Sequence, residues 1–226
     1  MTSFQTNQTN QTNEQRRAAP VRRGAMLWAL LCCVGALCAR EVSAADVPPD
    51  SPVGSAQALC NVLLETMKKG ESLDFAGRVK LLDPELRRLY DLPLVTRIVV
   101  GPPWRGFSPE DQQALVQAFS EYSTAVYASR FKSWSGEQFE VDPTSAKSPS
   151  GDVIVHTKLT PKGSDPVELD YLMRQEPSGW HIIDVLLNGT ISEMAERRSE
   201  YSSTLRDGGA SALVQLLKKK TAQLKG

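Results

Sequence analysis

Residues 153–187, VIVHTKLTPKGSDPVELDYLMRQEPSGWHIIDVLL, contain three segments in which apolar side chains recur at every second position. This alternation is typical of β-strands that bury one face. Two short turn sequences separate the segments, Pro161-Lys162-Gly163 and Pro177-Ser178-Gly179. Short connections join antiparallel neighbours, because a parallel pair needs a much longer crossover. Phe139 and Val141 predict a further strand ahead of these three.

Helical patterns lie on both sides of the strands. Ser108-Pro109-Glu110-Asp111 combines a capping serine, a proline in the first turn and acids near the positive end of the helix dipole. Asp83-Pro84 predicts a break or a fresh start, and Thr190-Ile191-Ser192-Glu193 is a capping-box sequence. Gly208-Gly209 is expected to end the helix that this box opens. We expect helices over residues 56–67, 73–82, 84–90, 92–100, 109–126, 190–207 and 211–224.

Helices, then an antiparallel meander, then helices again is the order typical of the α+β class. We therefore expect a curved antiparallel sheet wrapped by helices around an apolar cavity. The pattern does not decide whether that interior is filled by side chains or open to a ligand.

The N-terminal 44 residues have the features of an export signal. Residues 5–13 repeat Gln-Thr-Asn three times, and arginines occur between residues 16 and 23. An apolar run follows from Met26 to Ala39, and Val42-Ser43-Ala44 supplies small residues for cleavage. We therefore expect residues 1–44 to be a signal peptide with a low-complexity N-terminus.

The alternative to cleavage is a membrane anchor. The apolar run has 14 residues, whereas a spanning helix needs about 20, so we expect cleavage after Ala44 or Ala45. Residues 45–54 are rich in proline and predict a linker, and residues 55–226 predict one domain. This organisation predicts that the mature protein is exported.

Charge argues against a nucleic-acid partner. Five arginines and two glutamates lie within the first 44 residues, so the 26 basic and 26 acidic residues of the chain become 21 and 24 in the mature part. This leaves no basic excess to neutralise phosphates. Cys60 is the one cysteine beyond the signal, so no internal disulfide can form, and its apolar helical surroundings predict a buried, inert thiol.

The sequence contains no catalytic or metal-binding motif. The two histidines, His156 and His181, both fall in expected strands, and no metal-ligand spacing or nucleophile turn occurs. An enzyme hypothesis rests on Asp170, Tyr171 and Asp184, which could share a cavity and transfer a proton. The alternative is that both aspartates face solvent or pair with the nearby cations Arg174 and Lys158.

An ordered set of short motifs resembles the MlaC-type, or toluene-tolerance, family of periplasmic lipid-binding proteins. The first group comprises Tyr90-Asp91-Leu92-Pro93, Arg97, Gly101-Pro102-Pro103-Trp104, Ser108-Pro109-Glu110 and Phe119. The second comprises Pro166–Tyr171, Gly179-Trp180, Asp184-Val185-Leu186 and Arg206–Gly209 before a final helix. The sequences of residues 188–193 and 197–200 resemble the hopanoid-associated HpnM branch of this family.

The resemblance implies a fold similar to nuclear-transport-factor domains and a carrier function without cofactor or covalent chemistry. Such carriers move phospholipid between membranes as the substrate-binding component of an ABC lipid transporter of the inner membrane, with an outer-membrane partner. The hopanoid branch implies a rigid polycyclic lipid as the alternative ligand. Two other functions remain: a small isomerase-like enzyme in the same type of cavity, and an adaptor with a solid core.

A two-chain lipid has about 30 methylenes, each costing about 0.8 kcal/mol in water, so a carrier must bury the chains in a dry cavity. Arg97 is expected at the cavity mouth, where it meets a head group, or in a surface salt bridge. The expected lipid-binding residues are Leu92, Val95, Arg97, Ile98, Val99, Phe119, Tyr122, Val155, Leu169, Tyr171 and Leu186.

Overall fold

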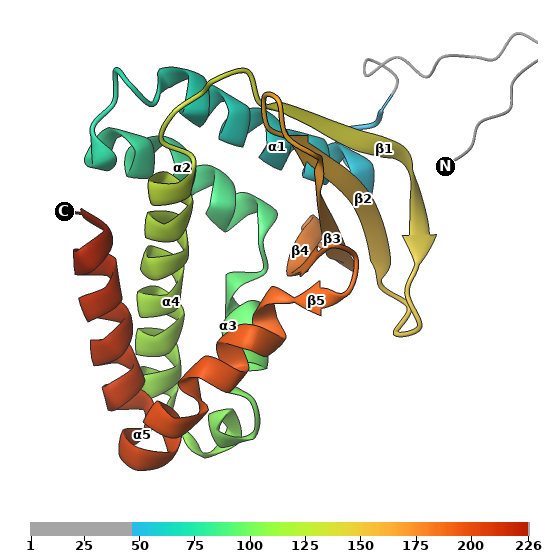
Figure 1. The fold of residues 1–226 in the computed structure, drawn as a ribbon. Helices are drawn as coiled ribbons and strands as arrows, with labels where there is room; N and C mark the ends of the chain where they lie inside the picture. The colour runs from blue at the N-terminus through green and yellow to red at the C-terminus, as the bar shows by residue number, and fades with distance from the viewer. Residues whose placement is uncertain (1–46, 226) are drawn as a thin grey trace, which may run out of the picture. The chain divides into compact units, whose positions relative to one another are not determined.

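The computed structural model describes residues 47–225, and these form an α+β domain with one antiparallel sheet (Figure 1). The expected signal peptide lies outside the described residues. The strands follow one another in chain order across the sheet. The elements are α1 (Pro52–Lys69), α2 (Phe75–Leu89), α3 (Leu92–Val100), η2 (Pro102–Gly106), α4 (Pro109–Arg130), β1 (Gln138–Lys147), β2 (Val153–Thr160), β3 (Val167–Glu176), β4 (Gly179–Leu187), β5 (Ile191–Ser192) and α5 (Glu193–Lys225).

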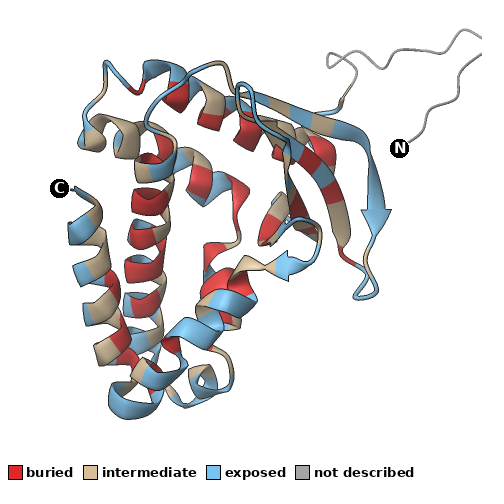
Figure 2. Ribbon diagram, viewed as in Figure 1, coloured by how far each residue is buried: buried red, intermediate tan, exposed pale blue. Residues whose placement is uncertain are grey.

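The three strands predicted from alternation are confirmed as β2, β3 and β4, and the predicted turns join them. On β2 the pattern is clear, because Val155 and Thr157 are buried whereas His156 and Lys158 are exposed. β1 pairs with β2 and carries an irregularity between Val141 and Ser145. Figure 2 shows β1 as largely exposed or half-buried, as befits an edge strand.

Helices cover the sheet and supply most of the core. α1 packs on the sheet through fully buried residues such as Leu59 and Leu63, and α4 and α5 lie side by side on the other flank of the molecule (Figure 1). The buried apolar residues of all these helices and of β2, β3 and β4 form one continuous cluster. The described residues therefore contain a complete core of their own.

Side chains at the helix starts satisfy backbone N–H groups that would otherwise lack partners. The Ser108 hydroxyl accepts from the Asp111 N–H at 3.1 Å, which confirms the predicted start of α4. The Ser51 hydroxyl accepts from the Gly54 N–H at 2.9 Å. α1 consequently begins at Pro52, within the segment 45–54 predicted as a linker.

Two helix boundaries differ from the prediction. α2 continues through Pro84, where a break or a fresh start was expected, because Leu82, Leu86 and Leu89 all pack into the core. At the other end of the sheet, Thr190 does not cap a helix: Ile191–Ser192 first pairs with β4 as β5. The Ser192 hydroxyl then accepts from the Ala195 N–H at 2.9 Å and opens α5.

The expected helix break at Gly208-Gly209 is present as a bend within α5. Gly209 has φ 63° and ψ −153°, a conformation essentially restricted to glycine, and it separates two helical parts. Figure 1 shows the second part running back alongside α4. Among the described residues, none of the helices combines the length and apolar character needed to cross a membrane.

Candidate functional site

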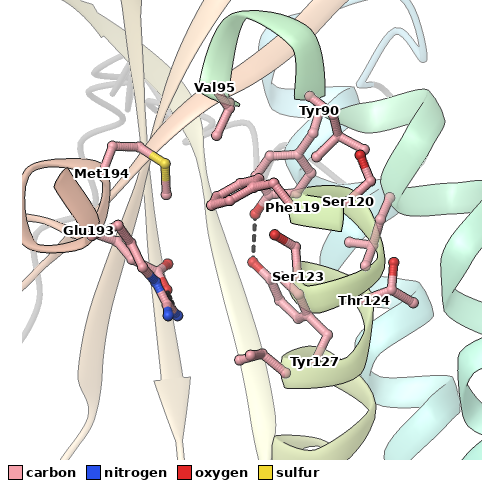
Figure 3. Close-up of a pocket in the computed structure, with 13 residues that line it drawn as sticks. Tyr90, Val95, Phe119, Ser120, Ser123, Thr124, Tyr127, Glu193 and Met194 are labelled. Atoms are coloured by element: carbon pink, nitrogen blue, oxygen red, sulfur yellow. Dashed lines mark hydrogen bonds and ion pairs between the residues drawn. The ribbon is translucent and has the colours of Figure 1, made fainter. Parts of the chain in front are cut away.

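An internal pocket lies between the end of α2, helix α3, helix α4 and the first turns of α5 (Figure 3). Its volume is about 30 Å³, which gives room for at least one water molecule. Most of its wall is apolar or aromatic. The lining residues are Leu86, Tyr90, Leu92, Val95, Phe119, Ser120, Ser123, Thr124, Val126, Tyr127, Glu193, Met194 and Arg197.

One face of α4 forms a whole side of this pocket. Phe119, Ser123 and Tyr127 are four residues apart, and Ser120 and Thr124 flank them on the same face. The Ser120 hydroxyl donates to the backbone carbonyl of Val116 at 2.7 Å, so it adds little polarity to the wall. The face is thus aromatic with small side chains between the rings, which leaves space beside the helix.

Two tyrosines close the inner end of the pocket. The hydroxyls of Tyr90 and Tyr127 are 2.5 Å apart and hydrogen-bonded, as the dashed line in Figure 3 shows. Burial raises the pKa of both phenols well above the ordinary value, so both stay neutral. The Asp91 N–H donates to the carbonyl of Ile182 in β4 at 3.2 Å, which holds the backbone beside Tyr90 against that strand.

Charged groups lie on the α5 side of the pocket. Arg197 donates to Glu193 at 3.0 Å and to the Tyr122 hydroxyl at 2.8 Å, and its guanidinium lies 5.1 Å from the centre of the Tyr122 ring. Burial lowers the pKa of Arg197, but Tyr201, Tyr122 and Glu193 raise it by more, so the side chain remains a cation. Arg197 therefore links α5 to α4 at the edge of an apolar space.

Asp184 on β4 anchors the start of α5. Its carboxylate accepts from the Ser192 hydroxyl at 2.5 Å and from the Met194 N–H at 3.2 Å. Burial raises the pKa of Asp184, while these hydrogen bonds act in the opposite direction. The position of Met194 and Glu193 across the pocket from α4 (Figure 3) follows from this anchor.

The three residues of the enzyme hypothesis do not share a pocket. Asp170 pairs with His156 Nδ1 at 2.8 Å, and Tyr171 is buried beside Cys60, whose thiol pKa burial raises to about 12. Asp184 holds α5, as described above. The predicted pairing with Arg174 and Lys158 is wrong, because Arg174 binds Asp152 through two hydrogen bonds of 2.8 Å. Within residues 47–225, no cluster of three or more His, Cys, Asp or Glu side chains could hold a metal.

The predicted lipid-binding residues fall into three places. Leu92, Val95 and Phe119 line the pocket. Arg97 and Ile98 line a separate surface hollow, and Arg97 makes no ion pair with any carboxylate of residues 47–225. The other six lie beside the pocket, in the core or partly buried on the sheet, as follows: Val99, Tyr122, Val155, Leu169, Tyr171 and Leu186.

The polar part of the lining, including Ser123, Glu193 and Arg197, was not among the residues predicted from the sequence. A signal for Ser123 was present, since it occupies the same helical face as Phe119 and Tyr127, where a solid core would place a large apolar residue. For Glu193 and Arg197 no local signal exists, because an exposed and a pocket-facing ion pair have the same i, i+4 spacing.

The comparison with protein families is decisive for the affiliation. A family model described as MlaC protein matches residues 57–219, which includes nearly every described element. The chain belongs to the MlaC family. The match begins inside α1 and ends inside α5, so the pocket of this MlaC-family chain lies entirely within the matched region. The part of the sequence interpretation that named this family is confirmed.

A solved structure supports the fold of this MlaC-family chain. It is a phospholipid-binding protein from Ralstonia solanacearum in complex with a phospholipid. The two structures superpose with a TM-score of 0.68 and 23% sequence identity, over 78% of this chain and 99% of that chain. At this identity the comparison establishes a shared fold, and the α+β architecture expected from the sequence is confirmed.

Proposed function

We propose that this MlaC-family protein is a periplasmic lipid carrier that holds acyl chains in the pocket between α3, α4 and α5. The observation that carries the proposal is the character of that pocket: an apolar space beside Phe119 and Val95, bounded on one side by the first part of α5. Apolar chains gain free energy in such a space because they leave water, about 0.8 kcal/mol for each methylene.

The pocket must widen to accept a lipid. Sites for small organic ligands have volumes of about 300–1,000 Å³, and this pocket measures about 30 Å³. We infer that the wall that moves is the first part of α5, because it borders the pocket opposite α4 and carries the polar residues Glu193 and Arg197. Displacing it would open the space along the face of α4. Its displacement would also require Met194 and Tyr201 to leave their buried positions in the core.

The polar groups on the α5 side support a definite orientation for the ligand. Acyl chains would lie against Phe119, Val95 and Leu92, and a head group would lie near Arg197 and Glu193. A guanidinium suits a phosphate because its planar N–H groups can form two parallel hydrogen bonds. In this arrangement Arg197 exchanges its contact with Glu193 for the lipid phosphate.

The transport role extends this binding function. A signal peptide over residues 1–44 would deliver the protein to the periplasm, where it would receive or deliver lipid at an inner-membrane ABC transporter and at an outer-membrane partner. A phospholipid is supported by the ligand of the Ralstonia relative. A hopanoid remains the alternative, motivated by the resemblance of residues 188–200 to the HpnM branch.

A pocket-blocking substitution tests the carrier function. In Ser123→Trp the indole is larger than the pocket of about 30 Å³, so it fills this space and displaces its neighbours. Circular dichroism checks that this variant is folded. Glu121→Trp places the same side chain on the exposed face of α4 and serves as the control. Each protein is incubated with vesicles that contain phospholipid and hopanoid, re-isolated, and weighed by native mass spectrometry. We expect bound lipid in the wild type and in the control, and at least a tenfold loss in Ser123→Trp.

The same experiment identifies the ligand and can reject the proposal. The mass of the bound species distinguishes a phospholipid from a hopanoid. A wild type that stays free of lipid after incubation would exclude the carrier function and favour an adaptor with a solid core. Equal lipid in Ser123→Trp and in the control would place the lipid outside this pocket.

A further inference from the structure

A second hollow lies on the surface formed by α3, η2 and α5. Its volume is about 700 Å³, far larger than that of the internal pocket, and it is open to solvent. Three arginines surround it, Arg97 from α3, Arg105 from η2 and Arg198 from α5, with Ile98 and Trp104 between them. We call it the arginine hollow.

The three arginines have no carboxylate partner among residues 47–225. Elsewhere on the domain Arg87, Arg88, Arg174 and Arg197 each contact an aspartate or glutamate within 3.0 Å. Arg78 instead donates to backbone carbonyls, and Arg130 has no described carboxylate partner, but neither lies beside another such arginine around a hollow. In a mature chain with more acidic than basic residues, three exposed guanidinium groups around one hollow, each left without an acid, indicate a local site for anions.

The backbone brings these groups together at Gly101. This glycine has φ 71°, and a Cβ atom at its position would lie 2.8 Å from Arg198 Nε. A side chain here would be strained by the positive φ and would displace the Arg198 guanidinium from the α3–η2 junction. Pro102 follows at once and fixes the direction of η2, which carries Arg105 and Trp104.

The floor of the hollow is apolar. Ile98 and Trp104 are half-buried and pack against the core, so each presents part of its surface to solvent between the arginines. Indole rings favour the boundary between hydrocarbon and water, where the ring contacts apolar groups and the N–H stays hydrated. The combination of three arginines with a tryptophan therefore matches a surface in which anionic head groups lie above hydrocarbon.

We propose that the arginine hollow docks this protein on a membrane surface that contains anionic phospholipids. The guanidinium groups would bind lipid phosphates, and Trp104 and Ile98 would reach the head-group boundary. The inference rests on the proposed function in one respect, since a lipid carrier must meet a membrane. Helix α3 connects the two sites: Leu92 and Val95 line the pocket, and Arg97 and Ile98 line the hollow. Docking here would place the wall of the pocket next to the lipid source.

Vesicle binding tests this proposal. The domain from residue 45 onward, which includes the complete core, is mixed with vesicles of phosphatidylcholine alone or with one third phosphatidylglycerol, and sedimented. The test variant carries Arg97→Gln, Arg105→Gln and Arg198→Gln. The control carries Arg87→Gln, Arg88→Gln and Arg130→Gln, which remove the same charge from exposed positions outside the hollow.

We expect the wild type and the control to bind the anionic vesicles and to lose this binding at high salt. Each arginine near an anionic surface contributes about 1 kcal/mol, so the test variant should bind about 100-fold more weakly. Trp104→Phe should abolish the quenching of protein fluorescence by brominated lipids, although Trp134 and Trp180 remain.

Two results would overturn the proposal. If the wild type does not bind anionic vesicles, the membrane proposal is wrong and an acidic protein becomes the better partner. If the test variant and the control lose vesicle binding equally, the binding depends on net charge and not on the hollow. Native mass spectrometry of the same samples keeps the two proposals apart. If the variant of the arginine hollow retains its lipid but no longer binds vesicles, the docking proposal is supported independently of the carrier function. If the wild type carries no lipid, the carrier function fails, whatever the result of the vesicle test.

Discussion

At the scale of single residues, the best-defined polar contact is the pair of hydrogen bonds between Asp152 and Arg174, both 2.8 Å long. They hold the start of β2 against β3. The hydrogen bonds from Arg174 lower the pKa of Asp152, against the opposing effect of burial. A carboxyl with a lowered pKa stabilises the fold above the pKa of the unfolded chain and loses this effect as the pH falls through the folded-state value.

We therefore expect Asp152→Asn to lower the free energy of unfolding by about 1 kcal/mol at pH 7, since Arg174 is partly exposed and solvent screens the pair. The difference from the wild type should shrink below about pH 4, where the aspartate of the unfolded chain is protonated. Urea unfolding across this pH range measures it. Asp165→Asn, in an exposed loop, is the control. A difference independent of pH would contradict the assignment.

Residue partners were the least predictable part of the molecule. The sequence suggested Arg174 and Lys158 as partners for Asp170 and Asp184; instead Asp170 binds His156 and Arg174 binds Asp152. These pairs depend on the register between β2 and β3, in which Val153 lies opposite Met173 and Val155 opposite Tyr171. A shift of one residue changes which side chains meet, and the sequence does not specify such shifts.

At the scale of elements, Pro84 is a local destabilising feature inside α2. Proline within a helix removes a hydrogen bond and crowds the preceding turn, at a cost of about 3 kcal/mol. Its side chain is exposed, so no packing is lost on replacement. We expect Pro84→Ala to raise the free energy of unfolding by about 1–3 kcal/mol, measured as a higher urea midpoint. Lys80→Ala, exposed on the same helix, should change it little, and a destabilised Pro84→Ala would refute the explanation.

The bend of α5 gives an opposite expectation. Nothing lies within 4 Å of a Cβ at Gly209, so its backbone conformation alone resists substitution. Gly209→Ala should cost about 1–3 kcal/mol of stability, whereas Gly106→Ala, with equal space and no positive φ, should be close to neutral. Thermal unfolding of the two variants compares them directly. Equal stability of the two variants would contradict this expectation, because it would mean that α5 can bend with a different backbone conformation at residue 209.

Elements were largely predictable because their signals are local. The serine cap of α4, the alternation of β2 and the glycine pair in α5 each lie within a few residues of the feature they determine. The failures arose where tertiary contacts outweigh a local signal: Pro84 remains in a helix because α2 buries Leu86, and β5 displaces the cap from Thr190 to Ser192.

At the scale of the whole molecule, the pocket depends on contacts between distant segments. Arg197 and the Tyr122 hydroxyl that it binds are 75 positions apart. Periodicity predicted that Leu92, Val95 and Phe119 face the interior, but it could not show that α5 would complete the wall. Whether the interior is a filled core or a binding pocket depends on how the helices pack together, which the pattern within one helix does not show.

If lipid enters this pocket, the rate of amide hydrogen exchange should change in the helices that form its wall. We expect lipid from vesicles to change amide exchange in α3, in the middle of α4 and in the first part of α5, while β1 and β2 remain unchanged. Mass spectrometry of peptides with and without lipid measures the pattern. The Ser123→Trp variant provides the comparison. A change centred on the sheet surface around His156 and Asp170, where a hollow of about 480 Å³ lies, would instead place the ligand there.

The small volume of the pocket also has a kinetic consequence. Because a chain cannot enter until α5 moves away from α4, loading requires an opening step before binding. The observed loading rate should then rise with vesicle concentration and level off at the rate of opening. The same wall delays departure, so a loaded lipid would have a long residence time in solution and would leave quickly only where a partner holds the helix open.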